Sequence, residues 1–532
     1  MPARQPKFAQ VVAMMTAFMV IIALLVGPIS QPASLSHTGS FIVRGLSADQ
    51  AARLVETYGG RVTSRLDIIH AVGARLSPYA AARMARDPSV LAVTPNFSMV
   101  TESLNANGLG KKKANDLPTS DSADVIGADA VWAAGVNGAG VTVAIVDTGI
   151  ADLQGLKKGA DGKGNRIAAW KDFVDGGGKK EDPSGHGTHV AGVIANSDKG
   201  ADGEWNGIAP GVNLVVARVA DENGFANYED VIEGIQWVVM NKDRYNTRVL
   251  NFSLSAPVRS PYWEDPVNLA LMVAWQAGIT VVSAAGNGGP SALTIGVPGN
   301  NPYVITVGAF TDAYTPADWS DDYIPTFSSA GPTHDGFVKP DLVAPGGHIV
   351  SLMEDSAKLA TTHPDNIIGK NYFTMAGTSQ AAAAVSGVAA LMISENPDLT
   401  PGMVKHRLRA SAIPQFDTET GEAGYSVWQQ GAGRVFAPLA VFADITDGPA
   451  NAGMDLVGDI FHEVHYLGYS YRDDDGTYRL FGDDGTWAGG AGVWDGYSIA
   501  DGGFWSDGGF WSDGGFWSDG GFWSDGGFWS DG

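Results

Sequence analysis

Short runs of Val, Ile and Leu alternate with stretches of helical spacing through the middle of the chain. Nearly continuous apolar runs of this length are typical of strands that are covered on both faces of a parallel sheet. The predicted strands are residues 141–146, 214–217, 249–252, 280–283 and 304–307. The predicted helices begin near Gly187, Tyr228, Asp265, Thr378 and Thr400. This alternation predicts an α/β domain with a mostly parallel sheet flanked by helices, which we place at residues 123–447.

A smaller pattern precedes this domain, between residues 37 and 100. Its predicted strands are residues 41–44, 61–66, 68–76 and 90–93, and its predicted helices are 47–58 and 77–87. The pattern predicts a small α+β unit, of a size that is only marginally stable alone. Residues 101–122 are polar and include Lys111-Lys-Lys113, which predicts an exposed linker.

The N-terminal residues have the layout of a secretory signal. Arg4 and Lys7 precede an unbroken apolar run over residues 8–27, and Ser34-Leu-Ser36 offers a cleavage site between small residues. We therefore expect residues 1–36 to be a signal peptide and the protein to be exported. The length of the run also suits an uncleaved membrane anchor, which is the alternative.

The C-terminal part changes in composition beyond residue 448. Gly, Asp and aromatic residues dominate there, and residues 501–530 are five copies of Asp-Gly-Gly-Phe-Trp-Ser. Phe and Trp would fall on opposite faces of a strand, so no single apolar face forms. We expect residues 448–532 to be a low-complexity tail whose repeated aromatics bind a cell-surface or matrix component.

The charge and the cysteine content of the chain limit the kinds of partner and metal site that it can have. The chain carries 58 acidic and 34 basic residues, a formal net charge of −24. Such a chain repels phosphate backbones, which argues against nucleic acid as a partner. It has no cysteine, which excludes disulfides and thiolate metal sites.

Four polar residues stand beside glycine at predicted ends of strands or helices. Asp147 follows the strand 141–146, at the carboxyl end where open α/β sheets bind ligands. His186 opens one helix, and Ser379 lies in the first turn of another. Asn287 follows the strand 280–283, and its amide can donate to an oxyanion. Together they supply a nucleophile, a base, a residue that orients the base and an oxyanion donor.

Each of these residues also has a plainer interpretation. Asp147 and Asn287 could belong to simple turns. His186 or His189 could be a structural histidine, or the two could form a metal pair, although the glutamate of zinc hydrolases is missing. Only the combination, in the order Asp, His, Ser, favours catalysis over turns and buried histidines.

The motifs around these residues resemble those of the subtilase (S8) family of serine proteases. The resemblance rests on Asp147-Thr-Gly-Ile150, His186-Gly-Thr-His189, Ala285-Gly-Asn-Gly288 and Gly377-Thr-Ser379, and it extends from about Asp124 to Val435. It implies a subtilisin-like fold and peptide hydrolysis through an acyl-enzyme intermediate. In that mechanism Asp147 orients His186, His186 is the general base, and Ser379 is the nucleophile. Asn287 and the backbone N–H of Ser379 form the oxyanion hole.

The resemblance also implies where the substrate lies and what it prefers. An extended substrate would pair with two edge segments, Gly224, Phe225 and Ala226 on one side and Ser253, Leu254 and Ser255 on the other. The pocket for the residue before the cut bond (P1) would be formed by Ala284, Ala285, Gly286 and Gly296. None of these residues is charged, so we expect broad activity with a preference for a large apolar P1 residue. Gln380 stands where the family usually has methionine, which predicts tolerance of oxidants.

Residues 37–100 resemble the inhibitor-like propeptide of these proteases. The resemblance implies that this unit occupies the cleft and is cut off within residues 99–122. The chemistry requires no cofactor, whereas structural calcium is implied by some family members. For this chain the loop 196–204 offers carboxylates, and a calcium site and a solvated surface loop are both open interpretations.

We therefore expect a secreted, self-processing serine endopeptidase that acts on proteins and peptides and is inhibited by its own propeptide. The main alternative is a catalytically silent surface protein that acts through its aromatic tail. A smaller alternative is a peptide ligase or acyl transferase that uses the same triad.

Overall fold

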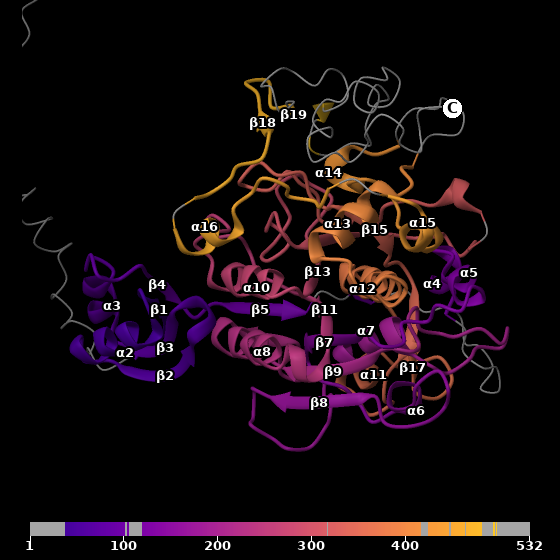
Figure 1. The fold of residues 1–532 in the computed structure, drawn as a ribbon, viewed down its shortest axis with the longest axis horizontal. Helices are drawn as coiled ribbons and strands as arrows, with labels where there is room; N and C mark the ends of the chain where they lie inside the picture. The colour runs from indigo at the N-terminus through magenta and orange to yellow at the C-terminus, as the bar shows by residue number, and fades with distance from the viewer. Residues whose placement is uncertain are drawn as a thin grey trace, which may run out of the picture.

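The computed structural model describes residues 38–101, 104–105, 120–316, 318–415, 424–445, 448–462, 464–480, 493–494 and 496. A small N-terminal unit lies at the side of a much larger α/β body (Figure 1). The predicted signal peptide, most of the linker and the hexapeptide repeats lie outside the described residues. Within the described ranges, no helix combines the length and the apolar character needed to cross a membrane.

A seven-stranded parallel sheet forms the centre of the large body. Its strand order is β15-β14-β13-β11-β7-β9-β8. The strands are β7 (Thr142–Asp147), β8 (Ile167–Asp172), β9 (Asn213–Arg218), β11 (Thr247–Phe252), β13 (Thr280–Ala284), β14 (Ile305–Phe310) and β15 (Leu342–Pro345). The five predicted strands are confirmed and are the inner five. The sequence did not predict the two edge strands, because β8 is only partly buried and β15 is four residues long and ends in proline.

The predicted helices of the large body begin where the sequence places them. They are α7 (His186–Ala195), α8 (Tyr228–Met240), α10 (Pro266–Gln276), α12 (Thr378–Glu395) and α13 (Pro401–Ala410). The side chain of Asp265 caps α10 and that of Thr400 caps α13, as such residues commonly do. Helix α12 is buried from Thr378 to Ile393, and it packs against α7 and the sheet. Its run of alanines lets the backbone approach these neighbours closely.

The remaining short helices of the large body connect these elements. They are α4 (Ser122–Val125), α5 (Ala128–Ala133), α6 (Gln154–Lys157), α9 (Lys242–Tyr245), α11 (Lys358–Thr362), α14 (Val427–Gln430) and α15 (Ala437–Phe442).

The small unit is an antiparallel sheet with two helices packed on it. The strand order is β2-β3-β1-β4, formed by β1 (Gly39–Arg44), β2 (Arg61–Leu66), β3 (Ala71–Leu76) and β4 (Ala92–Pro95). The helices are α2 (Ala48–Thr57) and α3 (Pro78–Met84), and a 3-10 turn, η1 (Asp67–Ile69), separates β2 from β3. The predicted α+β pattern is confirmed, except that the strand expected at 68–76 begins only at Ala71.

The beginning of the predicted linker pairs with strands of the large body. Strand β5 (Ser98–Thr101) pairs between β10 (Phe225–Asn227) and β12 (Leu254–Ser255). Strand β6 (Leu104–Asn105) pairs with β17 (Tyr372–Ala376), which in turn pairs with β16 (Ile349–Leu352). Of the residues predicted as linker, Thr101, Leu104 and Asn105 thus pair through their backbone with strands of the large body.

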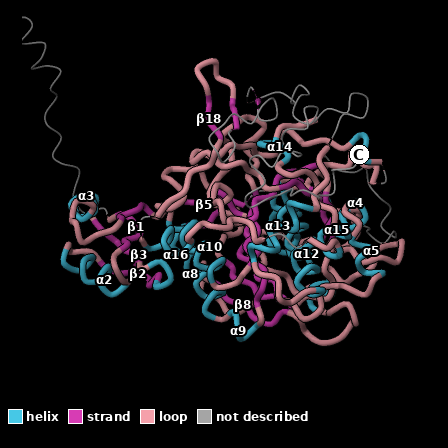
Figure 2. The backbone as a smooth tube through the Cα atoms, turned by 45° about the horizontal axis from the view of Figure 1, so that its top comes forward, coloured by secondary structure: helices cyan, strands magenta, loops and turns pink. Residues whose placement is uncertain are grey.

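The C-terminal segment packs on the large body well beyond residue 448, where composition alone predicts a tail. It forms α16 (Leu456–Phe461) and a small sheet of β18 (Ser470–Arg472), β19 (Tyr478–Leu480) and β20 (Val493–Trp494). Tyr478 and Trp494 are buried in one cluster with Trp428 of the body. Figure 2 shows β18 at the rim of the body. Composition did not reveal this packing because it depends on a few aromatic side chains in a glycine-rich stretch.

Candidate active site

Asp147 and His186 meet at the carboxyl edge of the sheet. Asp147 ends β7, and its Oδ1 atom lies 2.7 Å from Nδ1 of His186, the first residue of α7. The backbone N–H of Thr148 donates to the same oxygen at 2.7 Å. Both side chains of the pair are fully buried in the full chain. The carboxylate therefore fixes the ring and directs the other nitrogen, Nε2, away from β7.

A second buried carboxylate, Asp182, fixes the start of the histidine helix. It accepts hydrogen bonds from the backbone N–H groups of Gly185 at 2.9 Å and Thr188 at 2.7 Å, and from the Thr188 hydroxyl at 2.6 Å. It also accepts from the Thr148 hydroxyl at 2.8 Å. Asp182 thus ties the residue after Asp147 to the turn that carries His186. Sequence reasoning missed it, although an acidic residue just before a helix start is a common capping signal.

Ser379 lies at the second position of α12, directly after β17 and Gly377. Its hydroxyl donates to the carbonyl of Ser253 at 3.2 Å, beside the edge strand β12. A residue in the first turn of a helix has no intrahelical acceptor for its N–H. Both the hydroxyl and the backbone N–H of Ser379 are therefore placed by the strand-to-helix turn rather than by a flexible loop.

Asn287 is oriented by the residue that precedes Ser379. The Oδ1 atom of Asn287 accepts from the N–H and from the hydroxyl of Thr378, both at 3.0 Å. The Thr378 hydroxyl also accepts from the N–H of Gly286 at 3.2 Å. Because a backbone N–H can only donate, the Asn287 oxygen must face Thr378, and its NH₂ group points to the opposite side. The side chain of Asn287 is therefore oriented so that its NH₂ group is the hydrogen-bond donor on that opposite side. Sequence reasoning identified Asn287 but not the role of Thr378.

The chain itself occupies the groove between the two predicted substrate edges. Phe225 is opposite Val100, and Ala226 is opposite Met99. On the other side, Leu254 is opposite Thr101. Strand β5 is therefore held in the extended form that was expected of a substrate, as Figure 1 shows where it enters the body. The structure thus brings the segments 224–226 and 253–255 to the two sides of one strand.

The residues predicted to form the P1 pocket also lie together. The N–H of Gly296 donates to the carbonyl of Ala285 at 3.2 Å. A Cβ atom at Gly296 would lie 3.0 Å from the hydroxyl of Ser255, so the position has little room for a side chain. Ala284 and Ala285 are buried. The preference for an apolar P1 residue stays a prediction.

His189 is a structural histidine rather than a partner of His186 in a metal pair. Its Nε2 atom donates to the carbonyl of Phe373 at 3.1 Å. Burial lowers the pKa of His189 to about 3, so the ring is neutral at ordinary pH. This contact favours the plainer interpretation of the second histidine in the motif.

The loop considered as a calcium site, 196–204, does not gather its carboxylates. No three His, Cys, Asp or Glu side chains converge on one point among the residues that the structure describes. Asp202 accepts from the N–H of Glu204 at 2.8 Å, within the loop. Asp198 accepts from the Tyr372 hydroxyl at 3.4 Å. These contacts favour a loop that is held by its own hydrogen bonds and by Tyr372 of β17.

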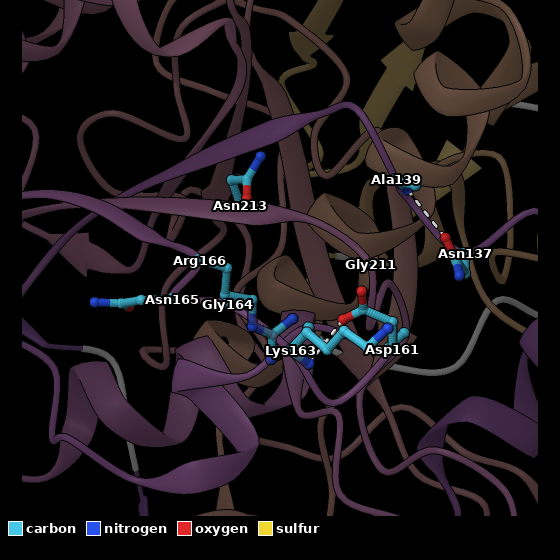
Figure 3. Close-up of a pocket in the computed structure, with 11 residues that line it drawn as sticks. Asn137, Ala139, Asp161, Lys163, Gly164, Asn165, Arg166, Gly211 and Asn213 are labelled. Atoms are coloured by element: carbon cyan, nitrogen blue, oxygen red, sulfur yellow. Dashed lines mark hydrogen bonds between the residues drawn. The ribbon is translucent and has the colours of Figure 1, made fainter.

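A buried arginine, Arg166, carries a positive charge next to Ala195, the residue that precedes this loop. Arg166 is 5% exposed, and its guanidinium donates to the carbonyls of Leu156 at 2.9 Å, Pro210 at 2.7 Å, and Gly155 and Ala195. Burial lowers its pKa to about 10, so it is still charged at neutral pH. Figure 3 shows Arg166 at the border of a polar surface hollow. Calcium also prefers carbonyl oxygens, but here a guanidinium binds them.

Known proteins are similar to this chain over the region that contains these site residues. The model of the subtilase family matches residues 138–434. The chain is 40% identical over 276 residues to serine protease AprX of Bacillus subtilis (strain 168). The aligned region covers 50% of this chain and 60% of AprX. It is 34% identical over 285 residues to subtilisin DY of Bacillus licheniformis, which covers 53% of this chain and 85% of subtilisin DY.

A solved structure has the same fold. Fervidolysin from Fervidobacterium pennivorans, a keratinolytic enzyme related to subtilisin, matches with a TM-score of 0.57 at 22% identity. The match covers 77% of this chain and 62% of fervidolysin. The chain thus spans about three fifths of the length of AprX and of fervidolysin.

Proposed function

Because the chain belongs to the subtilase family, we propose that it is a serine endopeptidase that uses Asp147, His186 and Ser379. The observation that supports this most is the place of Ser379. Its hydroxyl donates to the carbonyl of Ser253, the residue just before the edge strand β12, and β12 together with β10 holds an extended strand of the same chain. A catalytically silent protein would have no use for a nucleophile at this point, which argues against the rival function.

The proposed mechanism follows from the roles of these side chains. His186 accepts the proton of the Ser379 hydroxyl as the oxygen attacks the substrate carbonyl. Asp147 holds the imidazole and stabilises its charged form. The Asn287 amide and the Ser379 N–H donate to the oxyanion of the tetrahedral intermediate. His186 then returns the proton to the leaving amine, and water hydrolyses the acyl-enzyme in the same way.

The chain's own strand β5 serves as a guide to substrate preference. Met99 is fully buried in the groove and belongs to the main apolar core of the structure. The adjacent Val100 is 39% exposed, as expected for alternating residues of an edge-bound strand. We propose that substrates bind in the same register, with an apolar side chain at the position of Met99.

We propose that residues 37–100 are an inhibitory propeptide that the protease removes itself. The small unit is held on helix α8 as well as in the groove. Glu229 of α8 accepts hydrogen bonds from the hydroxyls of Thr63 at 2.5 Å and Ser64 at 2.7 Å, and its N–H donates to Asn96 at 2.9 Å. These contacts support an inhibitor that stays bound after the chain is cut.

We expect the wild-type chain to cut itself between residues 101 and 104. Strand β5 ends at Thr101 beside the edge β12, and β6 begins at Leu104 on β17, the strand that leads into Ser379. Intact mass and N-terminal sequencing of the purified chain over time measure the cut. A cut rate that does not change on dilution would identify the reaction as intramolecular. A new N-terminus within residues 106–119 would contradict the proposed register.

Replacing Asn287 with alanine should lower kcat by about 10²–10³ and leave KM nearly unchanged. This is the size of effect known for the corresponding asparagine of subtilisin, and its cause is that the amide donates mainly to the transition state. Steady-state hydrolysis of a soluble peptide measures both constants. Asn137→Ala, which changes a side chain in a surface turn, is the control. A loss confined to KM would remove Asn287 from the oxyanion hole.

We propose an extracytoplasmic location, on the strength of the apolar segment 8–27 that follows Arg4 and Lys7. We also propose that the repeats 501–530 act as a multivalent adhesive segment, because ten aromatic residues on one chain add many weak contacts. Retention on cells or insoluble matrix, compared between the full chain and a chain ending at residue 500, tests this second proposal.

A further inference from the structure

The short helix α16 lies where the small unit meets the large body. Both views place it next to α10 and toward the small unit (Figures 1 and 2). It belongs to the C-terminal segment, yet its residue Ile460 contacts Arg44, which lies 416 positions earlier in the chain. The proposed catalysis gives this segment no role.

One face of α16 is anchored in the large body through a buried carboxylate. Asp459 is 1% exposed and accepts hydrogen bonds from the hydroxyls of Tyr262 at 2.6 Å and Tyr303 at 2.9 Å. It also accepts from Nδ1 of His465 at 2.9 Å, and the His465 ring stacks on Trp263. A buried carboxylate with several donors holds its helix firmly, because losing a donor leaves charge without compensation.

The end of the same helix contacts the small unit. Nη2 of Arg44, on β1, donates to the carbonyl of Ile460 at 3.1 Å. The ring of Phe461 lies 5.0 Å from the ring of His70, the residue that joins η1 to β3. Arg44 is partly buried in this contact, and burial lowers the pKa of its guanidinium. A desolvated guanidinium depends strongly on the acceptor that it has.

These contacts are separate from the other places where the small unit is held, which include the apolar core that Ile42, Leu66 and Ile69 share with the large body. Strand β5 occupies the groove, and Glu229 of α8 binds the β2 edge. After a cut between residues 101 and 104, the small unit would be held only by non-covalent contacts. The Arg44 and Phe461 contacts then contribute directly to how long it stays.

We propose that α16 is a docking site for the propeptide, so that the C-terminal segment sets how long the enzyme stays inhibited after it has cut itself. The partner of this site is the chain's own unit of residues 38–95, recognised through a guanidinium and an imidazole ring. The inference rests on the proposed role of that unit as a propeptide. It assigns to the C-terminal segment a function in the control of activity rather than in catalysis.

The first test uses the uncut full chain with Ser379→Ala, so that it does not depend on proteolysis. We expect Phe461→Ala to raise amide hydrogen exchange of β1 and β3 about tenfold, while α10 and α12 stay protected. Phe461→Ala changes no residue of the small unit, so any loosening there comes from lost docking. Val457→Ala is the matched control, because Val457 is 42% exposed on the same helix.

Arg44 tests the same contact from the other side. Arg44→Lys keeps the charge but loses the planar donor group, and it should also raise the exchange of β3, whereas Arg53→Lys on the exposed face of α2 should not. If Phe461→Ala fails to fold, the comparison of Arg44→Lys with Arg53→Lys decides whether α16 docks the small unit. Exchange equal to that of the controls in both Phe461→Ala and Arg44→Lys would overturn the inference.

The second test uses the chain with Ser379 intact. Intact mass gives the time at which the chain is cut, and hydrolysis of a soluble peptide gives the time at which activity appears. We expect Phe461→Ala to shorten the interval between the two about tenfold without changing the cut rate. An unchanged interval would overturn the role in inhibition. A chain that never cuts itself would refute the proposed self-processing, and the exchange experiment would still decide whether α16 docks the small unit.

Discussion

Replacing Ser379 with alanine should leave the chain at its uncut length and remove its peptide hydrolysis. The hydroxyl of Ser379 lies at the turn from β17 into α12 and donates to Ser253, at the edge of the groove that holds β5. With no second nucleophile in the proposed mechanism, we expect a loss on the order of 10⁴–10⁶ in kcat. Intact mass of the purified chain over time, together with hydrolysis of a soluble peptide, measures both consequences.

The matched control for this substitution is Ser386→Ala. Ser386 lies on the same helix and is equally buried, but its hydroxyl donates to the side chain of Asn251 on β11 at 2.9 Å and not to the Ser253 carbonyl. This variant should be cut and should hydrolyse the peptide. If the purified Ser379→Ala chain matured at the normal rate, both self-processing and the assignment of the nucleophile would be refuted.

The sequence predicted those elements and residues that a short stretch of neighbouring residues is enough to identify. The five inner strands are apolar on both faces, so their runs are visible without knowledge of their neighbours. Asp147 and Asn287 lie within two residues of a glycine at the ends of such strands, and His186 and Ser379 lie within two residues of a glycine at the starts of helices. Once the sheet was predicted as parallel, the carboxyl edge brought Asp147 and Asn287 to the same side.

The sequence did not predict features that depend on distant partners. Asp182 and Thr378 have ordinary side chains whose importance comes from the groups that they orient. The edge strand β8 carries exposed residues, and so it lacks the apolar run of the inner strands. The packing of Trp494 on Trp428 joins a glycine-rich stretch to the body, and composition gives no sign of it.

Replacing Arg166 with methionine should produce the largest loss of stability among these variants. Its guanidinium donates to the carbonyls of Leu156 and Pro210, and also to those of Gly155 and Ala195. Methionine has a similar length and no donor, so several buried carbonyls would lose their partner at about 1–3 kcal/mol each. We expect the free energy of unfolding to fall by at least about 3 kcal/mol. Thermal unfolding of the uncut Ser379→Ala chain should then begin at least roughly 3–4 °C lower.

A chelator separates this role of Arg166 from that of a calcium ion. If the guanidinium is the cation that these carbonyls need, EDTA should leave the unfolding temperature of the Ser379→Ala chain unchanged. Lys163→Met is the control, because it removes one positive charge from an exposed side chain of the same segment. An unfolding temperature that drops on chelation, or that is equal in Arg166→Met and Lys163→Met, would contradict the prediction. The first result would show that a bound divalent ion contributes to the stability of the chain.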